Sequence, residues 1–232
     1  MTDGAIAGQH FSRELFRFLR DLKRHNDREW FAANKPRYER YAQRPAIRFV
    51  ADLGRELRKI SSHIVADPRP AGGALMRIYR DIRFSSDKSP YKTAVAMHFP
   101  IERHGGRMGP AYYLHLEPGR SSIGGGMWRP EPADLRKIRD AIVADDEGWR
   151  RAIDRVTAKG FRVAGMSLKR VPRGYDRNHP AAEDLKRVDF TISKPLGDSS
   201  VGRAGFYKVA ATACRDAAPY MRFLSDAVGL TW

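Results

Sequence analysis

The sequence predicts an α+β fold, with N-terminal helices and C-terminal helices packed on a central, mainly antiparallel sheet. Apolar residues recur at helical spacing in the N-terminal third and again near the C-terminus. Between these regions, short apolar runs alternate with turn residues, which is typical of strands joined by hairpins. With 232 residues, the chain is long enough to bury a core without disulfides or metal ions.

The N-terminal third is expected to form three helices. Ser12 can cap the first one, because its hydroxyl can accept a hydrogen bond from the free amides of a helix start. The polar face of this helix carries arginines three or four residues apart: Arg13, Arg17, Arg20 and Arg24. Asn26 and Glu29 have the spacing of a capping box that opens a second helix, which Pro36 should interrupt. A third helix, with the clearest apolar periodicity of the chain, follows Pro45.

The middle of the chain has the pattern of strands. The expected strands cover residues 75–79, 94–99, 112–117, 121–128 and 161–168. Pro118 and Gly119 favour a turn that joins the third and fourth of them. Two helices are expected before the last strand, one beginning at Pro132 and one running from about Glu147 to Gly160.

The C-terminal part combines a long connection with a final helix. Residues 171–197 are expected to form the connection, with helical content at 181–186. Pro219 should kink or restart the last helix. We find no internal repeat and no convincing linker, so residues 1–232 are expected to form one domain, with a loose or disordered N-terminus over about residues 1–10.

The charge and the residue composition indicate which kinds of molecule the protein can bind and in which compartment it can fold. The net charge of +16 and the isoelectric point near 10.3 favour polyanionic partners. The only cysteine, Cys214, excludes an internal disulfide and is expected to be a buried structural thiol. No secretory signal and no membrane-spanning stretch is apparent, so we expect a cytoplasmic protein without a membrane partner.

A cationic segment between residues 77 and 92 carries the strongest functional signal. Its candidate ligand-binding side chains are Arg77, Arg80, Arg83, Lys88, Tyr91 and Lys92. Only Asp81 and Asp87 oppose their charge. Clustered arginines repel one another unless an anion lies between them, and each guanidinium can donate two parallel hydrogen bonds to a phosphate or carboxylate. We therefore expect this segment to bind a small anionic ligand.

The backbone of the cationic segment is expected to turn near Asp81 and to bring its arginines together. A continuous strand would place Arg80 on the core side, beside the apolar side chains Ile78, Ile82 and Phe84. That face offers no carboxylate, and a buried guanidinium without one is costly. The other solution is a distant carboxylate that pairs with Arg80.

The same segment carries a resemblance to a known family. It contains the pattern R-x-x-R-D-x-R-F-x-x-x-K-x-x-Y, formed by Arg77, Arg80, Asp81, Arg83, Phe84, Lys88 and Tyr91. This pattern is similar to the signature of the bacterial conserved hypothetical proteins catalogued as domain of unknown function 2461. Residues 26–31, 112–119, 124–130 and 172–175 also look like landmarks of that family. The resemblance covers nearly the whole chain and implies one full-length domain centred on residues 77–91, but it implies no particular substrate.

Candidate catalytic residues lie outside and inside the cationic segment. Tyr113, His115 and Glu117 alternate on an expected strand and should share one face. His115 is the first candidate for a general acid or base, and Asp81 and Glu117 are further candidates for proton transfer. His98 ends a neighbouring strand and could join His115 and Glu117 around a divalent metal. The spacing typical of metal sites is missing, so we assign no metal.

A glycine run lies within the second strand of the expected hairpin, residues 121–128. Gly124, Gly125 and Gly126 lack the spacing of a phosphate-binding loop, and they should instead let another backbone or a ligand approach the strand. Trp128 is a further candidate ligand-binding residue as a pocket wall, unless it packs in the core. No motif identifies a cofactor.

Three functional hypotheses follow. The first is a pocket for a small phosphorylated or carboxylated ligand, in a protein that could be an enzyme acting on it. The second is non-specific nucleic-acid binding, which the net charge and the arginine face of the first helix favour. The third is that the cationic segment is a structural network of ion pairs.

Overall fold

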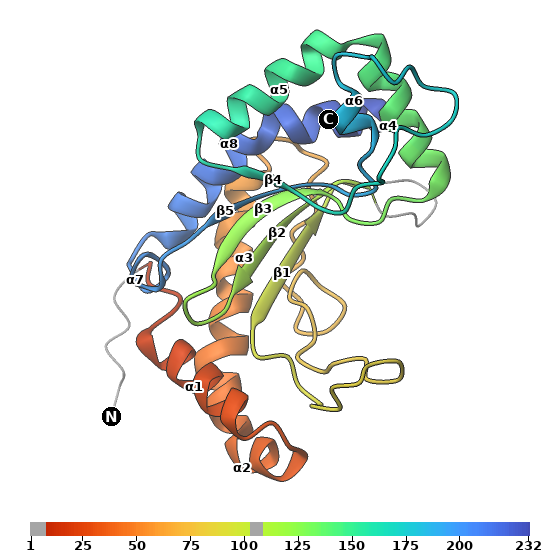
Figure 1. Ribbon diagram of the computed structural model, residues 1–232. Helices are drawn as coiled ribbons and strands as arrows, with labels where there is room; N and C mark the ends of the chain where they lie inside the picture. The colour runs from red at the N-terminus through yellow and green to blue at the C-terminus, as the bar shows by residue number, and fades with distance from the viewer. Residues whose placement is uncertain (1–7, 103–108) are drawn as a thin grey trace.

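The computed structural model describes residues 8–102 and 109–232, which form helices around an antiparallel sheet (Figure 1). The described residues build a five-stranded sheet with the strand order β1-β2-β3-β5-β4, and every pair of neighbouring strands is antiparallel. The predicted α+β class, with a mainly antiparallel sheet between N-terminal and C-terminal helices, is therefore confirmed.

The helices lie mostly where the apolar periodicity predicts them. Those before the sheet are α1 (Arg13–Arg24), α2 (Arg28–Tyr38), the π-helical turn η1 (Glu39–Gln43) and α3 (Arg44–Leu57). Those after the first three strands are α4 (Pro132–Ala144), α5 (Asp146–Ala158), α6 (Ala182–Leu185), α7 (Asp198–Val201) and α8 (Phe206–Ala227). Ser12 caps α1 as expected, since its hydroxyl accepts a hydrogen bond from the Glu14 amide.

Three details of the helix prediction are wrong. Asp27, not Asn26, caps α2, because its carboxylate accepts a hydrogen bond from the Trp30 amide at 2.8 Å. Pro36 lies inside α2, and the chain stays helical through η1 into α3. Pro219 lies inside α8, so the restart is wrong, whereas the kink stays a prediction. Both prolines follow helical turns anchored by buried side chains, so packing outweighs the lost backbone hydrogen bond.

The strands are β1 (Val95–Pro100), β2 (Ala111–Leu116), β3 (Ser122–Met127), β4 (Arg162–Ala164) and β5 (Phe190–Pro195). The expected strand at 75–79 is wrong, because this stretch forms only isolated bridges: Leu75 pairs with Met97 of β1, and Tyr79 pairs with Tyr91, which lies outside the sheet. β5 was missed in the expected connection, although Phe190 and Ile192 are buried in alternation with less buried neighbours. The expected strand at 161–168 shrinks to β4.

The glycine run on β3 permits close approach of backbone and helix. A Cβ atom added to Gly124 would lie 1.9 Å from the Ile192 carbonyl oxygen, and one added to Gly125 would lie 2.7 Å from the Met221 sulfur on α8. The interpretation that these glycines admit another backbone is therefore confirmed, and the approaching backbone is β5.

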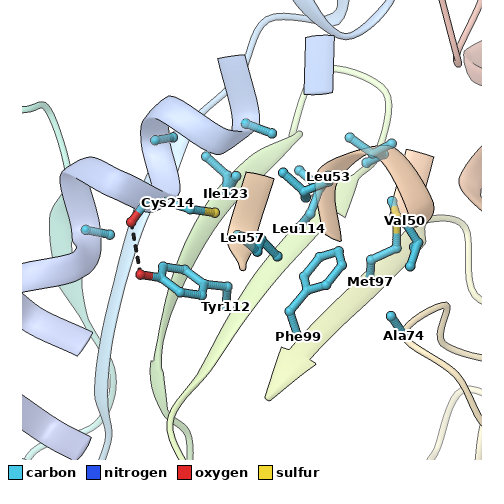
Figure 2. Packing of buried hydrophobic residues seen from close by; sticks show 14 of the residues in the cluster. Val50, Leu53, Leu57, Ala74, Met97, Phe99, Tyr112, Leu114, Ile123 and Cys214 are labelled. Carbon is cyan, nitrogen blue, oxygen red and sulfur yellow. Dashed lines mark hydrogen bonds between the residues drawn. The ribbon is translucent and has the colours of Figure 1, made fainter. Parts of the chain in front are cut away.

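One face of the sheet packs against α3 and α8 (Figure 2). The labelled side chains from these helices and from the strands include Leu53, Leu57, Met97, Phe99, Tyr112, Leu114, Ile123 and Cys214. The Tyr112 hydroxyl donates a hydrogen bond to the Cys214 carbonyl oxygen at 3.0 Å, so this buried phenol is satisfied. The buried apolar side chains of the described residues form one continuous cluster, and for that reason we continue to propose a single domain.

We expect Cys214 to be unreactive toward thiol reagents while the protein is folded. The thiol is buried, and burial raises its pKa far above the usual range, so almost no thiolate forms near neutral pH. Incubation with an aromatic disulfide that releases a coloured thiolate measures this reactivity directly. The same protein in guanidinium chloride is the control and should react at once. If the Cys214 thiol of the folded protein reacted fast, it could not be buried on α8 as we describe.

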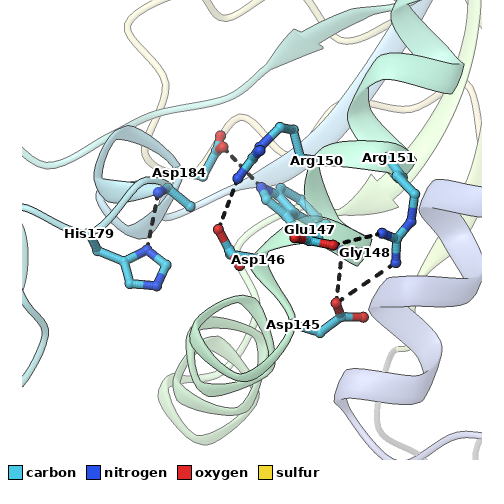
Figure 3. A network of polar contacts seen from close by, with 10 residues as sticks. Asp145, Asp146, Glu147, Gly148, Arg150, Arg151, His179 and Asp184 are labelled. Carbon is cyan, nitrogen blue, oxygen red and sulfur yellow. Dashed lines mark hydrogen bonds and ion pairs between the residues drawn. The ribbon is translucent and has the colours of Figure 1, made fainter.

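A polar network lies around the start of α5 and joins it to the chain at α6 (Figure 3). Asp145 caps α5, since its carboxylate accepts a hydrogen bond from the Gly148 amide at 2.8 Å. The buried Trp149 indole donates to the Asp184 carboxylate at 2.9 Å, which ties α5 to the chain around α6. The hydrogen bonds and ion pairs of this network lie within α5 and between α5 and the chain around α6, and none of them involves a residue of the cationic segment.

The described part of the N-terminus is anchored. The Gly205 amide donates to the Gly8 carbonyl oxygen, the Gln9 side chain donates to the Gly202 carbonyl oxygen, and His10 is buried beside Asp52. Residues 1–7, where the rest of the expected loose N-terminus falls, lie outside the described residues. No helix among the described residues has the length and apolar character needed to cross a membrane.

Candidate functional site

The cationic segment folds back on itself as an irregular hairpin. The Arg80 amide donates to the Pro90 carbonyl oxygen at 2.9 Å, and the Lys92 amide donates to the Ile78 carbonyl oxygen at 2.7 Å. The chain turns between Ile82 and Ser85, directly after Asp81, close to where we predicted a turn. In Figure 1 this loop lies beside β1.

The turn gives Phe84 and Arg80 surroundings that a continuous strand would not. Phe84, which a continuous strand would bury, lies at the tip with 96% of its surface exposed. Arg80 receives a carboxylate from within the segment, because its guanidinium forms an ion pair with Asp87 and a 3.4 Å hydrogen bond to the Ser85 hydroxyl. A distant carboxylate is therefore not needed.

A second local ion pair lies on the solvent side of the loop. Arg83 donates two hydrogen bonds to the Asp81 carboxylate, at 3.0 and 2.7 Å, and these bonds lower the pKa of Asp81 to about 2. The Arg83 side chain is 76% exposed. Asp81 therefore orients Arg83 at a position open to water.

A pocket of about 560 Å³ lies between this loop, the end of α1 and the exposed face of β1 and β2. Its lining residues are Lys23, Asn26, Met76, Arg80, Asp87, Ser89, Tyr91, Lys92, Thr93, Ala94, Ala96, Tyr113, His115 and Glu117. Five of the predicted site residues thus meet at one pocket: Arg80, Tyr91, Lys92, His115 and Glu117. The other predicted residues, Arg77, Asp81, Arg83, Lys88 and Trp128, do not line it, and their part in ligand binding or catalysis stays a prediction.

The β2 residues of the pocket form a short chain of polar groups. The His115 Nε2 atom lies 3.1 Å from a Glu117 carboxylate oxygen, and its Nδ1 atom lies 3.5 Å from the Tyr113 hydroxyl. The alternation of β2 explains this arrangement, because Tyr112, Leu114 and Leu116 point into the core and their neighbours point away from it. With Nε2 protonated, His115 donates to Glu117 and leaves Nδ1 as an acceptor.

His98 does not complete a metal site with these residues. It pairs in register with Tyr113, one step along the sheet from His115, and burial lowers its pKa. In the two described stretches of the chain, no group of three or more His, Cys, Asp or Glu side chains is placed to hold a metal ion.

Lys92 differs from the other cations of the loop. Its ammonium group is partly buried, and burial together with the neighbouring charge of Arg77 lowers its pKa. Among the described residues no carboxylate forms an ion pair with Lys92. The pocket therefore contains a partly desolvated cation without a protein counter-ion.

Sequence reasoning missed the residue that fixes the loop to the helices. The Asn26 side chain donates to the Tyr91 carbonyl oxygen at 2.9 Å and accepts from the Tyr91 amide at 3.0 Å. The Tyr91 ring stacks on Phe31 of α2 with a centroid distance of 4.1 Å. The Asn26 side chain thus bonds to both backbone groups of Tyr91, as the backbone of a neighbouring strand would. Because the two residues lie 65 positions apart, no local sequence pattern predicts this contact.

We expect Asn26→Ala to lower the free energy of unfolding by about 1–3 kcal/mol, because it leaves two backbone groups of Tyr91 without partners. Urea unfolding followed by circular dichroism measures the loss. Asn178→Ala is the matched control, since Asn178 is exposed and its side chain makes no hydrogen bond among the described residues. Equal stabilities of the two variants would mean that the two hydrogen bonds between Asn26 and Tyr91 do not stabilise the fold.

Trp128 is placed away from the pocket. It follows β3, is 70% exposed and carries the Arg129 guanidinium over its ring at 4.7 Å from the centroid. It does not pack in the core and does not line this pocket, so its part in binding a ligand stays a prediction.

Comparisons with known proteins agree with the sequence pattern. The family model described as "Conserved hypothetical protein (DUF2461)" matches residues 14–223. No curated protein and no solved structure matches the chain at a significant level. The match spans α1 to α8 and includes every residue that lines the pocket. The chain therefore belongs to the DUF2461 family of conserved hypothetical proteins.

Proposed function

We propose that this protein binds a small ligand bearing a phosphate or carboxylate group in the pocket beside β1 and β2. The observation that carries the proposal is Lys92, a partly buried cation without a carboxylate partner, in the same pocket as Arg80 and the His115–Glu117 pair. A desolvated cation is costly unless an anion compensates it. A bound phosphate or carboxylate would supply that charge.

The pocket would offer the ligand three cations and one group able to transfer a proton. Arg80 and Lys92 supply positive charge, and Lys23 at the end of α1 adds a third cation. Glu117 accepts from His115 and can hold its ring in one orientation, so His115 is the group that would move a proton to or from the ligand. On this proposal the protein is an enzyme or a binding protein that uses the same anion site.

The two other hypotheses receive less support. The arginines of α1 are exposed, which favours nucleic-acid binding, but two of them pair with carboxylates of the same helix: Arg17 with Glu14 and Arg24 with Asp21. The ion pairs of the loop are local and open to water, and such pairs contribute roughly 0–1 kcal/mol. A structural network of that strength does not explain why the ammonium group of Lys92 is partly buried without a carboxylate partner. We also retain the cytoplasm as the proposed location, since a lone thiol suits a reducing compartment.

A thermal-shift experiment with matched ligand pairs tests the proposal. Nucleotides, sugar phosphates and carboxylates are compared with their uncharged parents, and a short oligonucleotide is included, each at low and high salt. A ligand at about one hundred times its Kd stabilises by about 2.7 kcal/mol, which shifts Tm by roughly 5–10 °C for a chain of this size. We expect a shift with one anion that survives the higher salt.

Two outcomes would contradict the proposal. If no small anion shifts Tm, the pocket is not an anion site. If only the oligonucleotide does, and the shift disappears with salt, the protein binds polyanions through counterion release. The role of His115 has its own test by NMR, with His115→Gln used to assign its signal. A bound anion close to the ring should shift the His115 ring signals, and signals that stay unchanged on addition of the anion would remove His115 from the site.

A further inference from the structure

An exposed apolar surface lies at the end of the sheet remote from the cationic loop. We call it the Trp128 surface and define it by Trp128, Arg129, Met166 and Leu168. Trp128 is 70% exposed and Met166 is 61% exposed, and Leu168 is exposed as well. Large exposed apolar side chains on neighbouring segments of one face often mark an interaction site.

A single buried carboxylate organises this surface. The Asp189 side chain accepts a hydrogen bond from the Arg129 amide at 2.7 Å with one oxygen and from the Met166 amide at 3.0 Å with the other. Asp189 itself is buried and immediately precedes β5, which lies between β3 and β4 in the sheet. The chain after β3 and the chain after β4 are therefore both tied to the residue that precedes β5, one on each side of it, and Trp128 and Met166 belong to these two segments.

The backbone at Arg129 is strained to achieve this. Arg129 has a φ of +48°, and among the described residues it is the one non-glycine residue in the left-handed region. That conformation is unfavourable for an ordinary side chain and persists only where surrounding contacts enforce it. The Asp189 bond enforces it here, and the result places the guanidinium over the exposed Trp128 ring at 4.7 Å from its centroid.

Charge identifies the kind of partner. Arg129, Arg162, Lys169 and Arg170 surround the apolar side chains in sequence, and residues 161–172 contain no carboxylate. Glu131 is the nearest acidic residue along the chain after Trp128. A second copy of this protein, with its net charge of +16, would bring further positive charge, so self-association through this surface is disfavoured.

We propose that the Trp128 surface docks an acidic protein segment that carries apolar anchor residues. Tryptophan, methionine and arginine are the side chains enriched in the centres of protein interfaces. The apolar Met166 and Leu168 favour a polypeptide over a nucleic acid, whose backbone offers them no apolar contact. This inference does not depend on the proposed function of the pocket.

Fluorescence anisotropy with labelled peptides tests the inference on the full chain. The probes are a short peptide of glutamates with leucine and phenylalanine anchors, the same peptide with serines at the anchors, and a short oligothymidylate. We expect the anchored acidic peptide to bind best. Trp128→Ala and Met166→Ser should each weaken it about tenfold or more, the loss typical of a central interface residue. Both side chains are exposed, so both variants should keep their fold.

Phe84→Ala is the matched control, because Phe84 is a fully exposed aromatic residue on the distant loop. It should leave peptide affinity unchanged. Three results would overturn the inference: equal affinity for the anchored and the serine peptide, less than about twofold change in both variants, or tighter binding of the oligonucleotide that Trp128→Ala abolishes.

Discussion

Arg80→Ala is expected to weaken the binding of a small anion about tenfold to hundredfold, with little loss of stability. A hydrogen bond to a charged group contributes about 1.5–3 kcal/mol, and that range corresponds to this loss of affinity. The substitution also leaves Asp87 without its cation at the edge of the pocket, and this carboxylate then repels the ligand. Isothermal titration with the anion that gives the largest thermal shift measures the effect.

Arg83→Ala is the matched control for Arg80→Ala. Both residues are arginines of the same loop, and each pairs with an aspartate of that loop. Arg83, however, is 76% exposed and lies outside the pocket, so its removal should change affinity less than about twofold. Equal losses from the two variants would mean that the loop attracts anions only through its overall charge.

The stability of Arg80→Ala separates the anion site from a structural network. The Arg80 side chain is 26% exposed and that of Asp87 is 57% exposed. A pair so open to water contributes roughly 0–1 kcal/mol, whereas removal of one partner of a buried pair costs about 3–5 kcal/mol. We expect the smaller loss in urea unfolding. A loss of the larger size, with anion affinity unchanged, would establish the structural hypothesis instead.

Gly124→Ala is expected to destabilise the protein by more than about 4 kcal/mol or to prevent folding. The added methyl group would lie 1.9 Å from the carbonyl oxygen of Ile192 and 2.9 Å from the Ser193 Cα atom. These are backbone atoms of β5, so no side-chain rotation can relieve the overlap, and the β3–β5 pairing must separate. Thermal unfolding followed by circular dichroism, together with the yield of soluble protein, measures the effect.

Gly197→Ala provides the control for Gly124→Ala. The nearest atom to an added methyl group there is the Ser199 hydroxyl oxygen at 3.8 Å, and the backbone is extended. The variant should unfold within about 1 kcal/mol of the parent protein. If Gly124→Ala proved equally mild, β3 and β5 would not be paired as closely as we describe.

Local patterns in the sequence determined much of the site. The alternation of Tyr113, His115 and Glu117 against buried neighbours fixes their shared face, because successive side chains of a strand point to opposite sides. The apparent lack of a carboxylate for Arg80 indicated a turn near Asp81, since a buried unpaired guanidinium is too costly, and the segment turns directly after that residue. The expected gathering of the arginines is not seen at the pocket, because Arg80 lines it whereas Arg77 and Arg83 do not. Periodicity also placed α1, α3 and the first three strands.

Only the tertiary structure decided which of those residues meet. Asn26 and Tyr91 are joined by two hydrogen bonds across 65 positions, and nothing near either residue indicates the other. Arg83 was expected in the same anion site as Arg80, and Trp128 was expected as a pocket wall or a packed residue. Neither of them lines the pocket, because Arg83 lies on the exposed side of the loop and Trp128 lies beyond the end of β3. Period and propensity are properties of neighbouring residues, whereas a pocket depends on how distant segments are brought into register. The sequence by itself therefore determined the elements and their chemistry, and the packing of α1, the loop and β2 decided the site.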